Sequence, residues 1–149
     1  MVDFTSSKHI LLVDDNLDNL KVLSEILQAY GWRTLMATDG ESAIEQAEYA
    51  KPHLIVLDVM MPGIDGFETC RRLKANPITA NIPVIFMTAL MDTNSITHAF
   101  DLGAVDYITK PFQNQEVLAR IKTHFSLYML QMELEKLVAE KTHEVVKAK

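Results

Sequence analysis

Five side chains in this sequence are of the types that hold or accept a phosphoryl group. They comprise three carboxylates, one hydroxyl and one ammonium: Asp14, Asp15, Asp58, Thr88 and Lys110. Three carboxylates at one place repel each other and need a cation to stay ionised together, and an all-oxygen set with few protein ligands suits Mg²⁺. Lysine and threonine side chains can bind phosphate oxygens. An aspartate nucleophile, a metal and a lysine together predict phosphoryl transfer onto a carboxylate.

Each of these residues lies at the end of a short apolar run, of the kind that forms a buried strand. The runs predict five strands, over residues 9–13, 32–37, 54–57, 83–87 and 105–109. Apolar residues at helical spacing predict helices between the strands and a last helix from residue 113 to the end of the sequence. This alternation is typical of an α/β fold with a doubly wound, five-stranded parallel sheet and five helices.

A flavodoxin-like strand order, 2-1-3-4-5, would place strands one and three side by side, with a crevice at their carboxyl ends. Asp14 and Asp15 follow strand one, and Asp58 ends strand three. This order would therefore bring the three carboxylates together. An alternative role is open to Asp14, Asp15 and Asn16, because Asp and Asn also cap helices.

Composition limits the class of protein. A chain of 149 residues with a net charge of −6 has room for one domain and an appendage, and it lacks a basic stripe that would indicate nucleic-acid binding. No apolar run reaches the ~18 residues of a membrane span, and residues 1–8 lack the apolar segment of a secretory signal. A cytoplasmic protein is expected. Cys70 is expected to be a buried small residue, and Met60 and Met61 are expected to fill gaps in the core.

Several motifs resemble the receiver domain of bacterial two-component response regulators. They are Leu11-Leu12-Val13-Asp14-Asp15, the stretch from Leu57 to Gly66 (LDVMMPGIDG), Met87-Thr88-Ala89, Gly103-Ala104 and Tyr107-Ile108-Thr109-Lys110-Pro111-Phe112. The resemblance covers about residues 9–125. Residues 1–125 are therefore expected to form the receiver domain, and residues 126–149 a helical extension that forms a coiled coil.

The resemblance implies that Asp58 accepts a phosphoryl group from a histidine kinase or a phosphotransfer protein, and that the chain is a switch and not an enzyme. It also implies that four groups bind Mg²⁺: the side chains of Asp14, Asp15 and Asp58 and the backbone carbonyl of Met60. Lys110 would pair with the phosphoryl group, and its peptide bond to Pro111 is expected to be cis.

The same resemblance assigns a switch to Thr88 and Tyr107. Thr88 would move toward the phosphoryl group, and Tyr107 would turn from an exposed to an inward position. That shift would remodel the face formed by helix four, strand five and helix five, and the signal would continue along the last helix. Met60 and Leu90, two positions after Asp58 and Thr88, are apolar and imply slow self-hydrolysis of the phosphorylated form.

The last helix is predicted to extend beyond the domain, to a length of ~50 Å. Its apolar residues step by 4, 3 and 4, as in the seam of a coiled coil: Ile121, Phe125, Tyr128 and Met132. Leu134, Leu137 and Val138 then continue on a shifted phase, like a stutter in a coiled coil. An exposed apolar stripe of this kind calls for a partner, so a parallel homodimer through the helix is predicted. The alternative is a packing face at its start followed by a frayed, charged end. His124 and His143 are expected on its solvated side.

Two other functions stay open. One is a structural dimerisation module that keeps the fold without phosphorylation, and the other is a Mg²⁺-dependent aspartyl phosphohydrolase. Haloacid-dehalogenase-type phosphatases have a second acid two residues after the nucleophile, and Met60 at that position counts against the phosphohydrolase. The residues after 125 show no DNA-binding pattern, and the chain is expected to bind neither nucleic acid nor membrane.

Overall fold

The computed structural model describes the backbone of residues 8–148 and the side chains of residues 8–141. At its centre lies a five-stranded parallel sheet in the order β2-β1-β3-β4-β5. The strands are β1 (His9–Val13), β2 (Arg33–Ala37), β3 (Leu54–Leu57), β4 (Val84–Thr88) and β5 (Asp106–Thr109). The predicted fold class and strand order are confirmed, and the strand bounds agree with the prediction to within one residue.

Five helices join and follow the strands. They are α1 (Leu17–Ala29), α2 (Gly40–Ala50), α3 (Gly66–Ala75), α4 (Thr93–Asp101) and α5 (Asn114–Ala148). Helices α1 to α4 each begin after a side chain that accepts hydrogen bonds from amides of the first turn, namely Asn16, Asp39, Asp65 and Asp92. These caps satisfy amides that otherwise lack a partner. The cap of α1 is Asn16, which leaves the carboxylates of Asp14 and Asp15 for another role.

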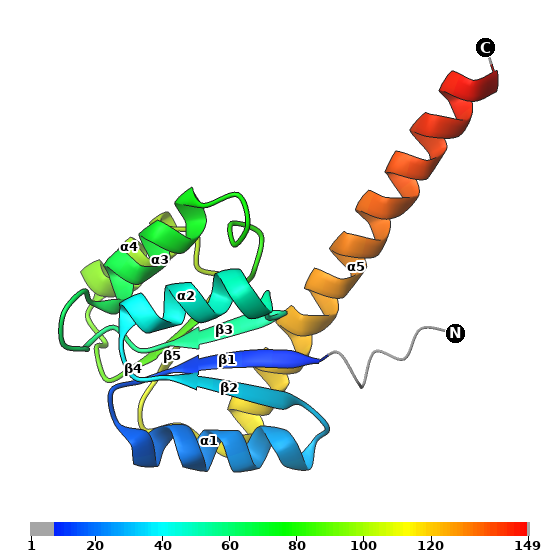
Figure 1. Cartoon of the computed structure of the whole chain (residues 1–149). Coiled ribbons are helices and arrows are strands. Elements are labelled where there is room, and N and C mark those ends of the chain that lie inside the picture. Colours follow the sequence, from blue (N-terminus) through cyan, green and yellow to red (C-terminus); the bar gives the residue numbers. More distant parts are fainter. Residues whose placement is uncertain (1–7, 149) are drawn as a thin grey trace.

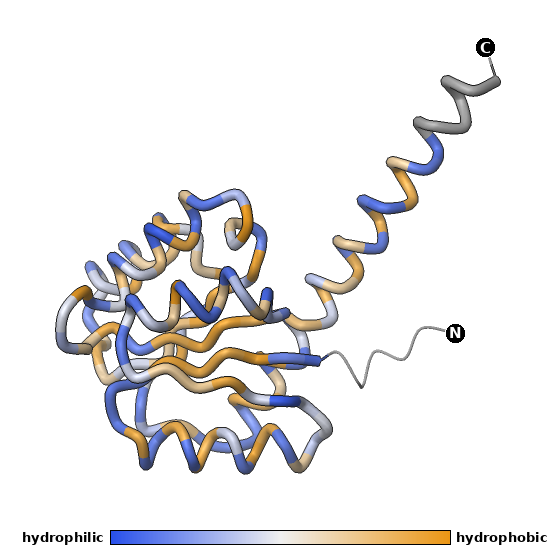
Figure 2. Tube along the Cα trace, in the orientation of Figure 1, coloured by the Kyte–Doolittle hydropathy of each residue, from blue (hydrophilic) through white to orange (hydrophobic). Residues whose placement is uncertain are grey.

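The helices cover both faces of the sheet (Figure 1). The first part of α5 and all of α1 lie on one face, and α2, α3 and α4 lie on the other. The central strands β1 and β3 are apolar along most of their length (Figure 2), and β3 is buried at every residue. A parallel strand covered by helices on both faces is expected to be apolar throughout. This burial fixes the end of β3, and Asp58 with it, in a rigid frame.

Helix α5 packs on the sheet only over its first part and then projects away from the domain (Figure 1). Val117, Leu118, Ile121 and Phe125 are buried in the core on the α1 side, where the Phe125 ring meets the Trp32 ring edge-on. The predicted coiled-coil seam is therefore wrong for Ile121 and Phe125. These two residues pack against their own domain, as the alternative of a packing face at the start of the helix required.

Two packing expectations are wrong, and one is confirmed. Met60 is 60% exposed and does not fill the core, although Met61 is half-buried against it. His124 is not solvated, because its Nε2 lies 3.1 Å from an oxygen of Asp106; the side chain of His143 is outside the described residues. Cys70 is buried, and its burial raises the pKa of the thiol to about 11.

Within residues 8–148, no helix combines the length and the apolar content that a membrane crossing needs.

Candidate functional site

Three carboxylates meet at the carboxyl ends of β1 and β3. These strands are neighbours in register, with Val13 opposite Leu57, and the Asp58 amide donates to the Val13 carbonyl at 2.9 Å. One carboxylate oxygen from each of Asp14, Asp15 and Asp58 lies within 4.8 Å of the others. The strand order thus brings together the residues that sequence analysis grouped.

Lys110 bridges two of these carboxylates from the end of β5. Its Nζ donates to Asp14 Oδ2 at 2.6 Å and to Asp58 Oδ2 at 2.9 Å. Burial lowers the pKa of the Lys110 ammonium, but the two carboxylates outweigh burial and raise it above its ordinary value. The peptide bond between Lys110 and Pro111 is cis, as predicted. Lys110 is therefore a fixed positive charge within the acidic pocket.

Asp14 is held by more partners than the sequence suggested. The backbone amide of Asn16 donates to its Oδ1 at 2.9 Å, and the side-chain amide of Asn19 lies 3.3 Å from its Oδ2. Burial raises the pKa of Asp14, but the hydrogen bonds from Lys110 and Asn16 leave it below its ordinary value. Asn19 was missed by sequence analysis. The signal that could have found it is its place in the first turn of α1, directly after the rim that carries Asp14 and Asp15.

Asp15 is the exposed member of the three. The pKa of Asp15 is raised above its ordinary value by partial burial and by the neighbouring carboxylates of Asp14 and Asp58. Three carboxylates against one ammonium leave two negative charges in the pocket by formal count. An all-oxygen donor set with this charge deficit fits a hard divalent cation such as Mg²⁺.

Thr88 and Tyr107 lie next to this pocket and are linked through Leu90. Thr88 is fully buried at the end of β4, its carbonyl accepts from the Lys110 amide at 2.9 Å, and its hydroxyl accepts from the Leu90 amide at 3.4 Å. The Tyr107 hydroxyl donates to the Leu90 carbonyl at 2.7 Å. Tyr107 is buried in this structure and packs against Phe86, so its ring occupies the inward position.

Gly66, the first residue of α3, ends the motif that begins at Leu57, but sequence analysis gave it no role of its own. A Cβ at this position would lie 2.1 Å from the Asp58 carbonyl oxygen. The Gly66 amide donates to the Val59 carbonyl at 2.7 Å, so the loop after β3 folds back tightly on itself. Within that loop the Met60 amide lies 3.3 Å from Asp58 Oδ1. Glycine is required here because the backbone passes so close to the Asp58 peptide.

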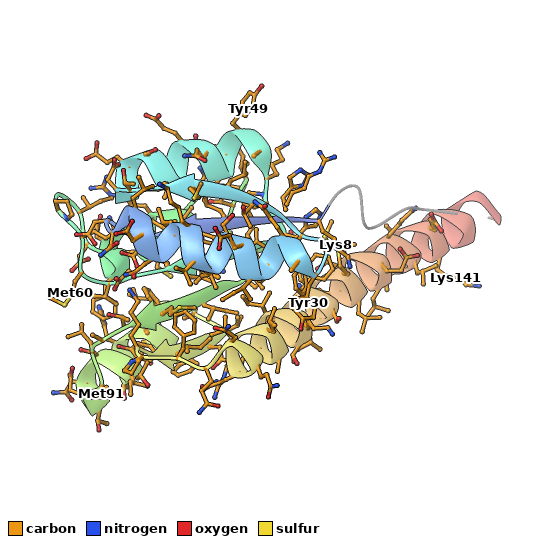
Figure 3. The ribbon with its side chains drawn as sticks, turned by 90° about the horizontal axis from the view of Figure 1, so that it is seen from below. Lys8, Tyr30, Tyr49, Met60, Met91 and Lys141 are labelled. Carbon is orange, nitrogen blue, oxygen red and sulfur yellow. The ribbon has the colours of Figure 1, made fainter. Side chains whose placement is uncertain are left out.

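Beside the carboxylates lies an open hollow. Its lining is mostly apolar, from Val59, Met60, Met61, Phe67 and Leu90, and includes the carboxylates of Asp15 and Asp65. Figure 3 shows Met60 and Met91 at this end of the molecule, and Lys141 on the projecting part of α5 at the opposite end. The pocket and the projecting helix are thus on opposite sides of the domain.

Comparison with curated proteins gives relatives that match over most of this chain. It is 41% identical over 116 residues to the alkaline phosphatase synthesis transcriptional regulatory protein PhoP of Bacillus subtilis, which covers 78% of this chain and 48% of PhoP. It is 41% identical over 123 residues to the response regulator PleD of Caulobacter vibrioides, which covers 81% of this chain and 27% of PleD. The chain therefore spans about half or less of the length of these relatives.

Solved structures agree with this result. The BeF3-activated DrrB receiver domain superposes with a TM-score of 0.70 at 39% identity, covering 80% of this chain and 97% of that chain. The signal receiver domain of a signal transduction histidine kinase from Syntrophus aciditrophicus superposes with a TM-score of 0.74 at 34% identity, covering 80% and 90% of the two chains. The family model of the response regulator receiver domain matches residues 10–122. The chain belongs to the response regulator receiver domain family.

Proposed function

We propose that Asp58 accepts a phosphoryl group from the phosphohistidine of a histidine kinase or a phosphotransfer protein, and that this step switches a signalling state. The observation that carries the proposal is the pocket itself. Oxygens of Asp14, Asp15 and Asp58 lie within 4.8 Å of one another, and Lys110 bridges two of them. A receiver domain in general works with a kinase partner.

In the proposed reaction an oxygen of Asp58 attacks the phosphorus atom, the bond between phosphorus and the donor histidine nitrogen breaks, and that nitrogen takes up a proton. Asp14, Asp15, Asp58 and the Met60 carbonyl would hold Mg²⁺, which neutralises charge on the transferring group when bound. The Lys110 ammonium, already 2.9 Å from Asp58, would pair with a phosphoryl oxygen, and the Thr88 hydroxyl would donate to another.

The hollow beside Asp15 provides the route by which a donor reaches Asp58. Its walls include Met60, Met61 and Leu90, so a donor side chain would enter along an apolar surface next to the acids. Met60 and Leu90 also suit a long-lived acyl phosphate, because neither side chain can orient an attacking water by a hydrogen bond.

The signal would travel from the pocket to α5 through β5. The Tyr107 hydroxyl donates a hydrogen bond to the Leu90 carbonyl at 2.7 Å. Its chain neighbour Asp106 contacts two side chains of α5, Arg120 at 2.6 Å and His124 at 3.1 Å. A shift of Thr88 toward the phosphoryl group would change the bond between Tyr107 and Leu90. Because Asp106 is next to Tyr107 in β5, this change would also move the first turns of α5. That helix would pair with the same helix of a second copy. Unchanged hydrogen exchange in α5 after phosphorylation would refute this route.

The test of phosphoryl acceptance is intact-protein mass spectrometry after incubation with acetyl phosphate, with Mg²⁺ and with a chelator. We expect the wild type to gain the mass of one phosphoryl group in Mg²⁺ only, and Asp58→Asn to gain none. Asp92→Asn is the matched control, because the Asp92 carboxylate caps α4 by accepting from the Ser95 amide and is not one of the three clustered carboxylates, and asparagine caps equally well.

Other outcomes would replace the proposal. Phosphate release at a steady rate without accumulation on Asp58 would favour the aspartyl phosphohydrolase. A wild-type mass that stays unchanged in Mg²⁺, with no release of phosphate, would refute phosphoryl acceptance and favour a structural module.

A further inference from the structure

The projecting part of α5 carries a line of four leucines that its own domain leaves uncovered. Leu127, Leu130, Leu134 and Leu137 are each between 49% and 66% exposed. They are spaced by 3, 4 and 3 residues, which corresponds to the two inward positions of a coiled-coil heptad. We call these residues the leucine seam.

The leucine seam lies on the opposite side of α5 from the residues that anchor this helix to the sheet. Leu127 follows Phe125 by two residues, a rotation of about 200° around the helix axis, and Phe125 is buried against Trp32 in the core. The seam predicted from the sequence begins with Ile121, Phe125, Tyr128 and Met132, on the domain-facing side, and only its continuation on a shifted phase shares Leu134 and Leu137 with the leucine seam. The leucine seam therefore points away from the domain to which the helix belongs.

We propose that the leucine seam pairs with the leucine seam of a second copy of this chain, in a parallel coiled coil. This inference rests on the proposed pairing through α5; it specifies the paired face and gives a physical reason for the parallel direction. Leucines at heptad spacing fit the holes that an identical helix presents at the same heights. A helix in register with its own copy supplies a leucine opposite every leucine.

The charges beside the seam select the parallel direction. Glu133 and Glu140 flank the leucines on one side, and Gln131 and Val138 flank them on the other side. Parallel helices place the glutamate side of one chain against the uncharged side of its copy. Antiparallel helices place the glutamates of both chains on the same edge, where like charges repel.

The polar residues before Leu127 set the point where the pair begins. The same line of the helix continues back through Thr123 and Arg120, and Arg120 is engaged by Asp106 of its own domain at 2.6 Å. An arginine in this position does not favour pairing. The two helices therefore meet from Leu127 onward, where α5 leaves the sheet. Because the leucine seam faces away from its own domain, the two domains would lie on opposite sides of the helix pair.

The test compares the full chain with two single variants by sedimentation equilibrium over a concentration series. The wild type is expected to pass from 16.8 kDa to twice that mass as concentration rises. Leu134→Lys is expected to raise the dissociation constant of the dimer about tenfold or more. Met132→Lys is the matched control, because Met132 is also an exposed apolar residue of α5 but lies two residues away on the opposite face.

Oxidative cross-linking tests the direction. In a parallel pair, Leu127→Cys and Leu137→Cys each form a disulfide with the same residue of the second copy. In an antiparallel pair neither does so alone, whereas a mixture of the two variants cross-links. Cys70 is fully buried and does not contribute.

Several results would overturn the inference. They are a monomer at every concentration, dissociation by Met132→Lys but not by Leu134→Lys, and cross-linking only in the mixture. Monomers at every concentration would exclude a second copy as the partner of the leucine seam. Phosphoryl uptake is measured by mass spectrometry on the same samples. A protein that stays monomeric but is still phosphorylated at Asp58 would refute pairing through the leucine seam and leave the proposed phosphoryl acceptance unaffected.

Discussion

Replacing Lys110 by methionine removes the positive charge that bridges two carboxylates and keeps most of the apolar length of the side chain. The Lys110 Nζ lies 2.6 Å from Asp14 and 2.9 Å from Asp58. Without the Lys110 ammonium, the carboxylates of Asp14, Asp15 and Asp58 lie close together, and the bridging positive charge between Asp14 and Asp58 is lost. We expect Lys110→Met to lower the free energy of unfolding at neutral pH.

The size of this loss follows from the burial of the three groups. Removing one member of a buried ion pair costs about 3–5 kcal/mol. The Lys110 side chain is 20% exposed and the two carboxylates are each 10% exposed, so solvent screens part of the effect, and we expect a loss of about 2–3 kcal/mol. For a chain of this length that corresponds to a fall in Tm of about 5–10 °C.

Asp14 makes the loss depend on pH. Burial raises the pKa of Asp14, but the hydrogen bonds from Lys110 and Asn16 hold it below its ordinary value of 3.8. A carboxyl group whose folded-state pKa is lowered stabilises the fold above its unfolded-state pKa, and that contribution is lost as pH falls through the folded-state value. Without Lys110 the folded-state pKa rises. The cost of Lys110→Met is therefore full at pH 7 and shrinks below about pH 4.

Urea unfolding at pH 7 and at pH 3.5, with a chelator present, measures both effects. Lys74→Met is the matched control, because Lys74 is a half-buried lysine that donates to the carbonyls of Ala80 and Ile82 and to no carboxylate. Its cost is expected to be the same at both pH values. If Lys110→Met costs as much at pH 3.5 as at pH 7, its role is packing and the charge argument fails.

Two further substitutions test the backbone around the pocket. Gly66→Ala places a Cβ 2.1 Å from the Asp58 carbonyl oxygen, and we expect a loss of about 1–3 kcal/mol in urea unfolding; an unchanged midpoint would mean that the loop after β3 relaxes freely. Tyr107→Phe removes the hydrogen bond to the Leu90 carbonyl, and we expect a loss of about 0.5–1.5 kcal/mol in the same assay. A more stable Tyr107→Phe variant would show that this bond is strained in the wild type.

The sequence by itself determined the sheet and the membership of the pocket. Buried parallel strands have uninterrupted apolar runs, and polar residues placed directly after such runs must gather at one rim. The sequence alone therefore groups Asp14, Asp15 and Asp58, and it groups Lys110 with them although Lys110 lies 96 residues from Asp14 along the chain. The contacts of Asn19 and Gly66 could not be predicted in this way, because they depend on how the loops and the first turn of α1 fold onto that rim.

Only the tertiary structure decided which face of α5 is free. The sequence offers two apolar lines on this helix, one through Ile121 and Phe125 and another through Leu127 and Leu134. Helical periodicity describes both equally well, because it records which residues share a face and not what covers that face. The packing of Phe125 against Trp32 assigns the first line to the core. The second line is left uncovered because α5 leaves the sheet with that side turned outward.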